Sequence, residues 1–264
     1  MHKNDGILIR WNDMIQKGAV LMSRTNPSVP LRFLLFLLIF ALISYAFSYV
    51  ASREQHDDDV LQATPSSSPF PFTVVLDAGH GGEDGGAVSA SGLYEKDLNL
   101  QVAQLLCELL EANGVKVVMT RTTDTLLYDR NVDYQGRKKA LDLAARREIA
   151  EQTPNALFVS IHMNAFPKTQ YHGLQVWYSP NHGESRHVAE EIRATVQEGL
   201  QPENDRQIKE ATSSIYLLHH LSCPAVLIEC GFLSNPAEAE RLGDTIYQKE
   251  LAFLLFLAIM ESQA

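Results

Sequence analysis

The sequence predicts an α/β fold: a single layered domain with a central, mostly parallel twisted sheet flanked by helices, preceded by one transmembrane helix. Two observations support this prediction. From residue 73 onward, short apolar runs alternate with segments of helical periodicity, as in layered α/β domains. Earlier in the chain, residues 33–51 contain no charged side chain. That length is close to the ~20 apolar residues that cross a bilayer as a helix.

The segment before this apolar stretch is basic, although the whole chain has a net charge of −10. Basic residues beside a span resist translocation, so we expect the leader 1–32 to remain in the cytoplasm and the later residues to lie outside. This predicts a single-pass protein of the cell membrane, with 33–51 as its anchor. Small residues near the end of 33–51 leave a cleaved signal, followed by secretion, as the alternative.

Residues 52–72 are predicted to form a flexible linker. They contain an acidic triplet at 57–59 and a Pro-Ser-Ser-Ser-Pro run at 65–69, with few apolar side chains to bury. The acidic composition also argues against a nucleic-acid partner, which requires a basic surface. The three cysteines are too few for a disulfide-stapled scaffold.

The remaining residues, 73–262, are predicted to form the catalytic domain. Short and mainly apolar runs predict strands at 73–77, 115–120, 156–161, 173–178 and 225–228. Apolar residues at helical spacing predict helices at 96–112, 136–151, 187–200 and 245–260.

Three of these strands lead into residues that can bind a metal ion or transfer a proton. His80 follows the first strand, His162 the third and Glu229 the fifth. Since the carboxyl ends of parallel strands meet at one edge of a sheet, we expect the three side chains to converge. Glu95 opens the first helix after a loop with five glycines, which allow the backbone to return towards His80. Imidazole and carboxylate groups are zinc ligands, and catalytic zinc sites keep one position open for water.

Each of these residues also has a purely structural interpretation. His80 could cap the glycine-rich loop, and His162 could be a buried histidine with ordinary hydrogen bonds. Glu95 could complement the positive end of its helix. Glu229 is the hardest to explain in this way, because a carboxylate that ends an apolar strand is costly unless it is paired.

These residues lie in sequence blocks that resemble zinc-dependent N-acetylmuramoyl-L-alanine amidases of bacterial cell walls, in the class called amidase type 3. The blocks are 76–82 (LDAGHGG), 95–96 (EK), 120–121 (TR), 143–146 (LAAR), 158–165 (FVSIHMNA) and 228–235 (IECGFLSN). The resemblance implies that His80, Glu95 and His162 bind one zinc ion. It also implies that Glu229 is the catalytic carboxylate, acting as general base on a zinc-activated water.

By the same resemblance, the substrate is peptidoglycan, and the bond cut joins N-acetylmuramic acid to the L-alanine of the stem peptide. The lone membrane anchor without wall-binding repeats is most similar to the spore-cortex, germination-associated members. A protein activator is left open. The alternatives are a zinc peptidase or carboxypeptidase that acts on wall peptides, and a non-catalytic wall-binding module. The presence of all four site residues argues against the module.

Five further residues are candidates for binding substrate or supporting the site. Asp77 is expected to orient a ligand histidine or to cap the loop. Arg121 and Arg146 bind carboxylates of the peptide, support the site or form structural ion pairs. Ser160 and Asn164 flank His162 and are expected to bind substrate or to hydrogen-bond within the site.

Overall fold

The structure, a computed structural model, describes residues 71–129, 131 and 135–263. The predicted leader 1–32, the predicted span 33–51 and nearly all of the predicted linker 52–72 lie outside these residues. No helix within the described part of the chain is long and apolar enough to cross a membrane.

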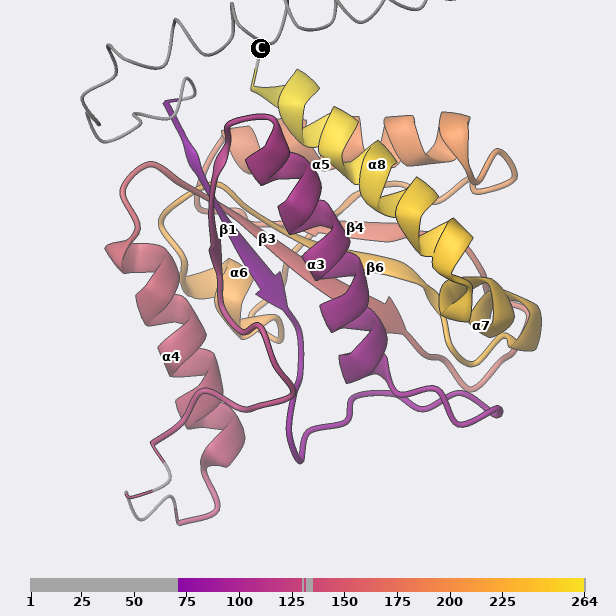
Figure 1. The fold of residues 1–264 in the computed structure, drawn as a ribbon, viewed down its shortest axis with the longest axis horizontal. Coiled ribbons are helices and arrows are strands. Elements are labelled where there is room, and N and C mark those ends of the chain that lie inside the picture. The colour runs from indigo at the N-terminus through magenta and orange to yellow at the C-terminus, as the bar shows by residue number, and fades with distance from the viewer. Residues whose placement is uncertain (1–70, 130, 132–134, 264) are drawn as a thin grey trace, which may run out of the picture. The chain divides into compact units, whose positions relative to one another are not determined.

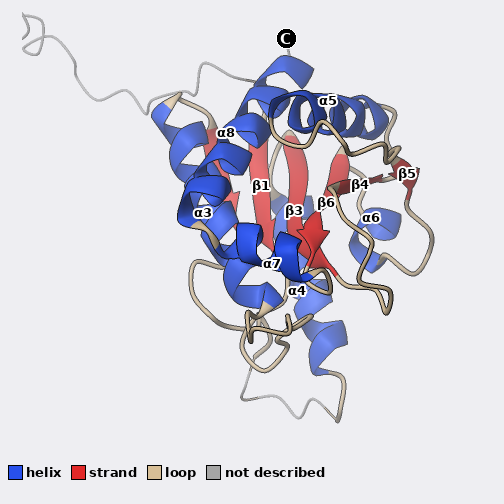
Figure 2. Ribbon diagram, turned by 90° about the vertical axis from the view of Figure 1, so that its right-hand side faces the viewer, coloured by secondary structure: helices blue, strands red, loops and turns tan. Residues whose placement is uncertain are grey.

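A six-stranded sheet lies at the centre of the described residues. Its strands are β1 (Thr73–Ala78), β2 (Lys116–Met119), β3 (Ala156–Asn164), β4 (Gln175–Tyr178), β5 (Lys209–Glu210) and β6 (Ala225–Phe232). The spatial order is β2-β1-β3-β6-β4-β5, and Figure 2 shows the central strands side by side in that order. The first four strands of this order are parallel, whereas β4 is antiparallel to β6 and β5 is parallel to β4.

Helices cover both faces of the sheet. One face packs against α3 (Glu95–Ala112), α5 (Glu184–Gly199), α7 (Pro236–Gly243) and α8 (Thr245–Ser262), which together enclose the larger apolar core. The other face packs against α4 (Lys138–Gln152) and α6 (Tyr216–His220), which enclose a smaller core. Figure 1 shows α3 and α8 in front of the sheet and α6 behind it.

Strand alternation decides on which face the site residues lie. Successive side chains of a strand point to opposite faces, so residues two or four apart share a face. Phe158 of β3 and Leu227 of β6 belong to the smaller core. His162 and Glu229 follow them by four and two residues and therefore lie on the same face, the one covered by α4 and α6.

The predicted mixed α/β domain with a single sheet is confirmed. Two strands run further than predicted, because β3 ends at Asn164 and β6 at Phe232. His162 and Glu229 therefore lie within strands rather than after them. The two residues pair with each other across the neighbouring strands β3 and β6. Past Glu229, β6 remains paired on its β3 side, where Phe232 pairs with Asn164, whereas its pairing with β4 ends at Glu229.

Candidate active site

His80 lies in a sharp turn directly after β1. Its backbone has φ of 62°, in the left-handed region that is unusual for residues other than glycine, and Gly81 and Gly82 also have positive φ. This turn brings the His80 imidazole back over the carboxyl end of the sheet. Its Nδ1 lies 2.9 Å from Asp84 Oδ1 and its Nε2 lies 3.2 Å from Glu95 Oε1.

Glu95, the first residue of α3, is only 4% exposed. The loop before it folds back tightly at Gly86, where φ is 65° and an added Cβ would lie 2.5 Å from Glu95 Oε2. Glu95 Oε2 accepts a hydrogen bond from the Ala87 N–H at 2.7 Å. This bond fixes the carboxylate with its other oxygen, Oε1, towards the histidines. The expectation that a glycine loop returns Glu95 to His80 is thus met by the geometry.

His162 completes the group from β3. Its Nδ1 lies 3.0 Å from Glu95 Oε1, and its ring meets that of His80 edge to face at 5.0 Å between centroids. Gly79 packs directly against this ring, because an added Cβ there would lie 2.2 Å from His162 Nε2. The imidazole therefore occupies space that only a glycine at position 79 leaves open.

The donor atoms of His80, Glu95 and His162 lie within 4.8 Å of one another and suit a metal ion. Two imidazole nitrogens and one carboxylate oxygen match the ligands that zinc takes in catalytic sites. Burial raises the pKa of Glu95, but its hydrogen bonds with His162 and His80 outweigh this and hold that pKa well below its ordinary value. The carboxylate is therefore ionised, as a metal ligand must be.

Glu229 lies beside this cluster, paired with His162 across the β3–β6 ladder. Its Oε2 is buried and has no hydrogen-bond partner among the described residues. Burial is the main reason that the pKa of Glu229 is raised to about 7, although the charge of His162 lowers it. A carboxyl group that titrates near neutral pH and has an uncommitted oxygen is suited to proton transfer.

Arg121 and Arg146 are both buried, and their guanidinium groups hold the backbone that carries His80. Arg121 donates to the carbonyl oxygens of Ala78 and Gly79 at 2.8 and 3.0 Å. Arg146 donates to those of Ala78 and His80 at 2.8 and 2.7 Å. Three consecutive carbonyls are therefore fixed by two arginines. These contacts favour the supporting role and leave little donor capacity for the carboxylates of a substrate.

Asp77 is 1% exposed and helps to hold the same part of the site as the two arginines. It accepts hydrogen bonds from Arg146 Nη1 at 2.6 Å, Thr120 Oγ1 at 2.7 Å and Ser160 Oγ at 2.6 Å. Among the described residues, no hydrogen bond joins Asp77 to His80 or to another ligand histidine. The expectation that Asp77 orients a histidine directly is therefore not met, since its oxygens are occupied by these three donors.

Ser160 is fully buried behind the site, where its hydroxyl is committed to Asp77. It is thus placed to support the site rather than to contact a substrate. Asn164 ends β3, and its backbone carbonyl accepts the Leu233 N–H at 2.7 Å. This bond ties the two strand ends together beyond the pair of His162 and Glu229.

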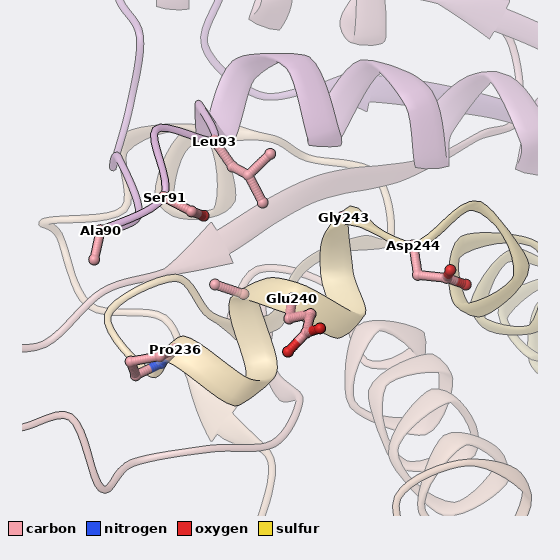
Figure 3. Close-up of a pocket in the computed structure, with 8 residues that line it drawn as sticks. Ala90, Ser91, Leu93, Pro236, Glu240, Gly243 and Asp244 are labelled. Atoms are coloured by element: carbon pink, nitrogen blue, oxygen red, sulfur yellow. The ribbon is translucent and has the colours of Figure 1, made fainter.

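The surface around the cluster is shallow. A cavity of about 80 Å³ lies beside His80 and His162, with Lys139 and Leu217 also on its wall. It is too small to enclose a glycan or a peptide, so a substrate of that size must lie across the edge of the sheet. A wider cavity of about 690 Å³ lies between residues 90–93 and α7 (Figure 3), but its lining includes none of the four predicted site residues.

The family model for N-acetylmuramoyl-L-alanine amidases matches residues 74–261, a range that contains the whole site. The chain belongs to this amidase family. It is 36% identical over 231 residues to the germination-specific N-acetylmuramoyl-L-alanine amidase of Bacillus subtilis. That match covers 87% of this chain and 94% of the relative.

Solved structures give the same assignment. The CwlD amidase from Clostridioides difficile, determined in complex with the GerS lipoprotein, matches with 37% identity and a TM-score of 0.69. That match covers 72% of this amidase and 98% of the other chain. The amidase AmiC2 of Nostoc punctiforme matches with 32% identity and a TM-score of 0.61, over 72% and 96% of the two chains. The amidase is thus a peptidoglycan hydrolase, as predicted.

Sequence reasoning missed several residues that hold the amidase site together. Asp84 contacts His80, and Asp142 accepts from Arg146 Nε at 2.8 Å. Asn99, buried within α3, donates to the Gly79 carbonyl at 3.0 Å. A signal existed for Asp142, which precedes Arg146 by four residues in a predicted helix, the spacing at which opposite charges pair.

Proposed function

We propose that this amidase cuts the bond between N-acetylmuramic acid and L-alanine with one zinc ion held by His80, Glu95 and His162, and with Glu229 as the proton-transferring carboxylate. The observation that carries the proposal is the convergence of three suitable donors beside a buried carboxyl group with an unpartnered oxygen. When bound, zinc would supply Lewis-acid polarisation of the scissile carbonyl and lower the pKa of a bound water.

Glu229 acts on protons at both stages of the reaction. In its ionised form the carboxylate accepts a proton from the attacking water, and in its protonated form it donates that proton to the leaving nitrogen of L-alanine. The unpartnered Oε2 supports this role, since no protein group competes for it.

The buried arginines contribute by holding the ligand backbone in place. Arg146 binds the His80 carbonyl, and Arg121 binds the carbonyls of Gly79 and of Lys96, the residue after Glu95. Two of the three proposed ligands are therefore tied to one rigid frame. Rigid support of this kind preserves metal affinity, because metal sites tolerate only small errors in ligand position.

We further propose that 33–51 anchors the enzyme in the cell membrane, with 1–32 in the cytoplasm and the catalytic domain outside. The charge pattern supports this orientation. The match to the B. subtilis relative spans 231 residues, more than residues 71–264 contain, so the likeness extends into the segment before the domain. Secretion after cleavage is the alternative. Membrane fractionation with protease treatment of intact cells separates the two.

A role in maturation of the spore cortex is proposed from the relatives. One is described as germination-specific, and another was solved with a lipoprotein bound. A protein partner of the lipoprotein kind is therefore proposed here as well. Deletion of the gene in a spore-forming host, followed by analysis of cortex fragments, tests the cortical role.

The reaction itself is tested with the purified full-length chain. It is loaded with zinc and incubated with purified peptidoglycan, and the products are identified by mass spectrometry, with a chelator-treated sample as control. Release of intact stem peptide, lost on chelation and restored by zinc, supports the proposal. Cleavage within the stem would instead favour the peptidase alternative. No cleavage despite bound zinc would favour the wall-binding module or the need for a partner.

A further inference from the structure

The stem peptide that this reaction releases carries free carboxylate groups, which call for a cation at the edge of the site. Arg121 and Arg146, the two arginines that the sequence suggested for this purpose, are buried and bound to backbone carbonyls. Lys96 is engaged by Asp124 and by the Gly82 carbonyl, and Lys139 faces Asp84 at 3.5 Å. These cations are therefore already committed to the protein.

Arg206, in the segment between α5 and β5, has the contacts of a preorganised carboxylate-binding group. Its Nε donates to the His172 carbonyl at 2.8 Å. Its guanidinium carbon lies 4.6 Å from the ring centroid of Phe232 and 5.7 Å from that of Tyr171. Among the described residues, neither Nη atom has a hydrogen-bond or ion-pair partner. Stacking and the Nε hydrogen bond thus fix the plane of the guanidinium group and leave its two Nη nitrogens as donors for a ligand.

The strand register places Arg206 at the catalytic edge. Phe232 pairs with Asn164 of β3, two residues after the pair of His162 and Glu229, which is about 7 Å along the sheet at ~3.3 Å per residue. β4 is antiparallel to β6, and its residue Gln175 pairs with Glu229. The residues that precede Gln175, including His172, therefore lie beside those that follow Glu229. Arg206 contacts both segments, so it lies just beyond Glu229 along the sheet.

An aromatic surface adjoins the guanidinium group. Tyr171 packs edge to face on Phe166 at 5.0 Å between centroids, and Phe166 is 47% exposed. The Phe166 backbone N–H is held by Ser234 Oγ at 3.0 Å, which fixes the start of this loop. An exposed ring beside an oriented cation offers apolar contact and charge recognition to the same ligand. A peptide with small apolar side chains and free carboxylates has the matching chemistry.

We propose that Arg206, with Tyr171 and Phe166 beside it, forms a subsite that binds a carboxylate of the stem peptide. The subsite determines specificity and binding rather than bond cleavage, since it lies apart from the metal ligands. This inference rests on the proposed function, because it assumes that the peptide side of the scissile bond extends along β6 beyond Glu229.

The test uses the full-length zinc-loaded chain and two substrates, a muropeptide with free stem carboxylates and the same muropeptide with those groups converted to amides. Arg206→Gln is expected to raise KM for the free-carboxylate substrate about tenfold to a hundredfold, with little change in kcat. It should leave KM for the amidated substrate unchanged. Arg206→Lys keeps the charge but loses the paired Nη donors of the guanidinium group. Its KM for the free-carboxylate substrate should therefore lie between that of the unmodified chain and that of Arg206→Gln.

Arg186→Gln is the matched control, because Arg186 lies in the first turn of α5, after the far end of β4. Among the described residues, its ion-pair partner is Glu190, one helical turn away. Arg186→Gln should change neither KM. Calorimetric titration with the free stem peptide compares the peptide affinity of the same variants without turnover. It therefore tests the subsite even when the amide bond is not cut. Equal effects of Arg206→Gln on both substrates would show a structural role, and no effect on either substrate or on peptide binding would overturn the proposal.

Discussion

Substitution of Gly79 by alanine tests whether the position of His162 sets the affinity for metal. An added Cβ would lie 2.2 Å from Nε2, 2.3 Å from Cε1 and 2.7 Å from Cδ2 of the His162 ring. Ordinary van der Waals contact begins at 3.4 Å, so the ring or the backbone must move by about 1 Å. Metal ligands tolerate errors of only about 0.2 Å.

We therefore expect Gly79→Ala to lower zinc affinity by at least the ~10–100-fold that loss of a supporting contact causes. Overpacking should also destabilise the metal-free protein by about 1–3 kcal/mol. Zinc affinity is measured by competition with a chromophoric chelator, and stability by chemical denaturation of the metal-free chain. In a His162→Ala background the clash is gone, so the stability cost of Gly79→Ala should largely disappear.

Gly183→Ala is the control, because Gly183 has φ of −61° and nothing lies within 4 Å of its added Cβ. It should leave zinc affinity unchanged, and any loss of stability should stay within about 1 kcal/mol, because Gly183 is the N-cap of α5, where alanine is less favourable than glycine. If Gly79→Ala bound zinc as tightly as the unmodified chain, the ring position would not limit affinity, and the reasoning would be refuted.

Three other predictions concern the carboxyl groups and Arg146. Glu229→Gln should retain zinc but lose nearly all release of stem peptide; full turnover would exclude Glu229 as the proton carrier. Arg146→Lys should cost about 3 kcal/mol of unfolding free energy and lower zinc affinity about tenfold, because lysine cannot replace the five hydrogen bonds of Arg146. Burial raises the pKa of Asp77, but Arg146 and two hydroxyl donors hold it below its ordinary value. Asp77 therefore stabilises the fold above its unfolded pKa, and that contribution is lost as the pH falls through the folded pKa. Urea denaturation from pH 7 to pH 3 should show a shallower loss for Asp77→Asn; an identical profile would contradict this.

Much of the fold follows from local sequence. The runs at 73–77, 156–161 and 225–228 are mainly apolar because their strands are covered on both faces, and this makes them recognisable in the sequence. The return of Glu95 towards His80 was also predictable, since the glycines before Glu95 indicate a tight loop. β5 and α6 contain too few residues for a periodic pattern to develop. α7 did have a signal, because Asn235 caps it and Pro236 is its first residue.

The partners of the buried charges were not predictable, because they lie far apart in sequence. Arg146 and Asp77 are 69 residues apart, and nothing local to either residue names the other. The sequence alone therefore could not distinguish whether Arg146 binds substrate or forms a structural ion pair. Arg206 illustrates the reverse case. It stands in an irregular segment with no motif, and only the pairing of β4 with β6 places it near Glu229.

The end of β2 explains why arginines gather behind the metal ligands. β2 pairs with β1 only as far as Met119 and Leu76, whereas β1 continues and then turns into His80. The carbonyl groups beyond this point lose a strand partner on that side, and buried carbonyls without hydrogen bonds are costly. Arg121, two residues after β2, and Arg146 from α4 supply the missing donors. Because side-chain donors, unlike a further strand, do not impose extended backbone, His80 can adopt its left-handed conformation and face Glu95. The requirement to satisfy these carbonyls and the requirement to aim a metal ligand thus have one structural solution.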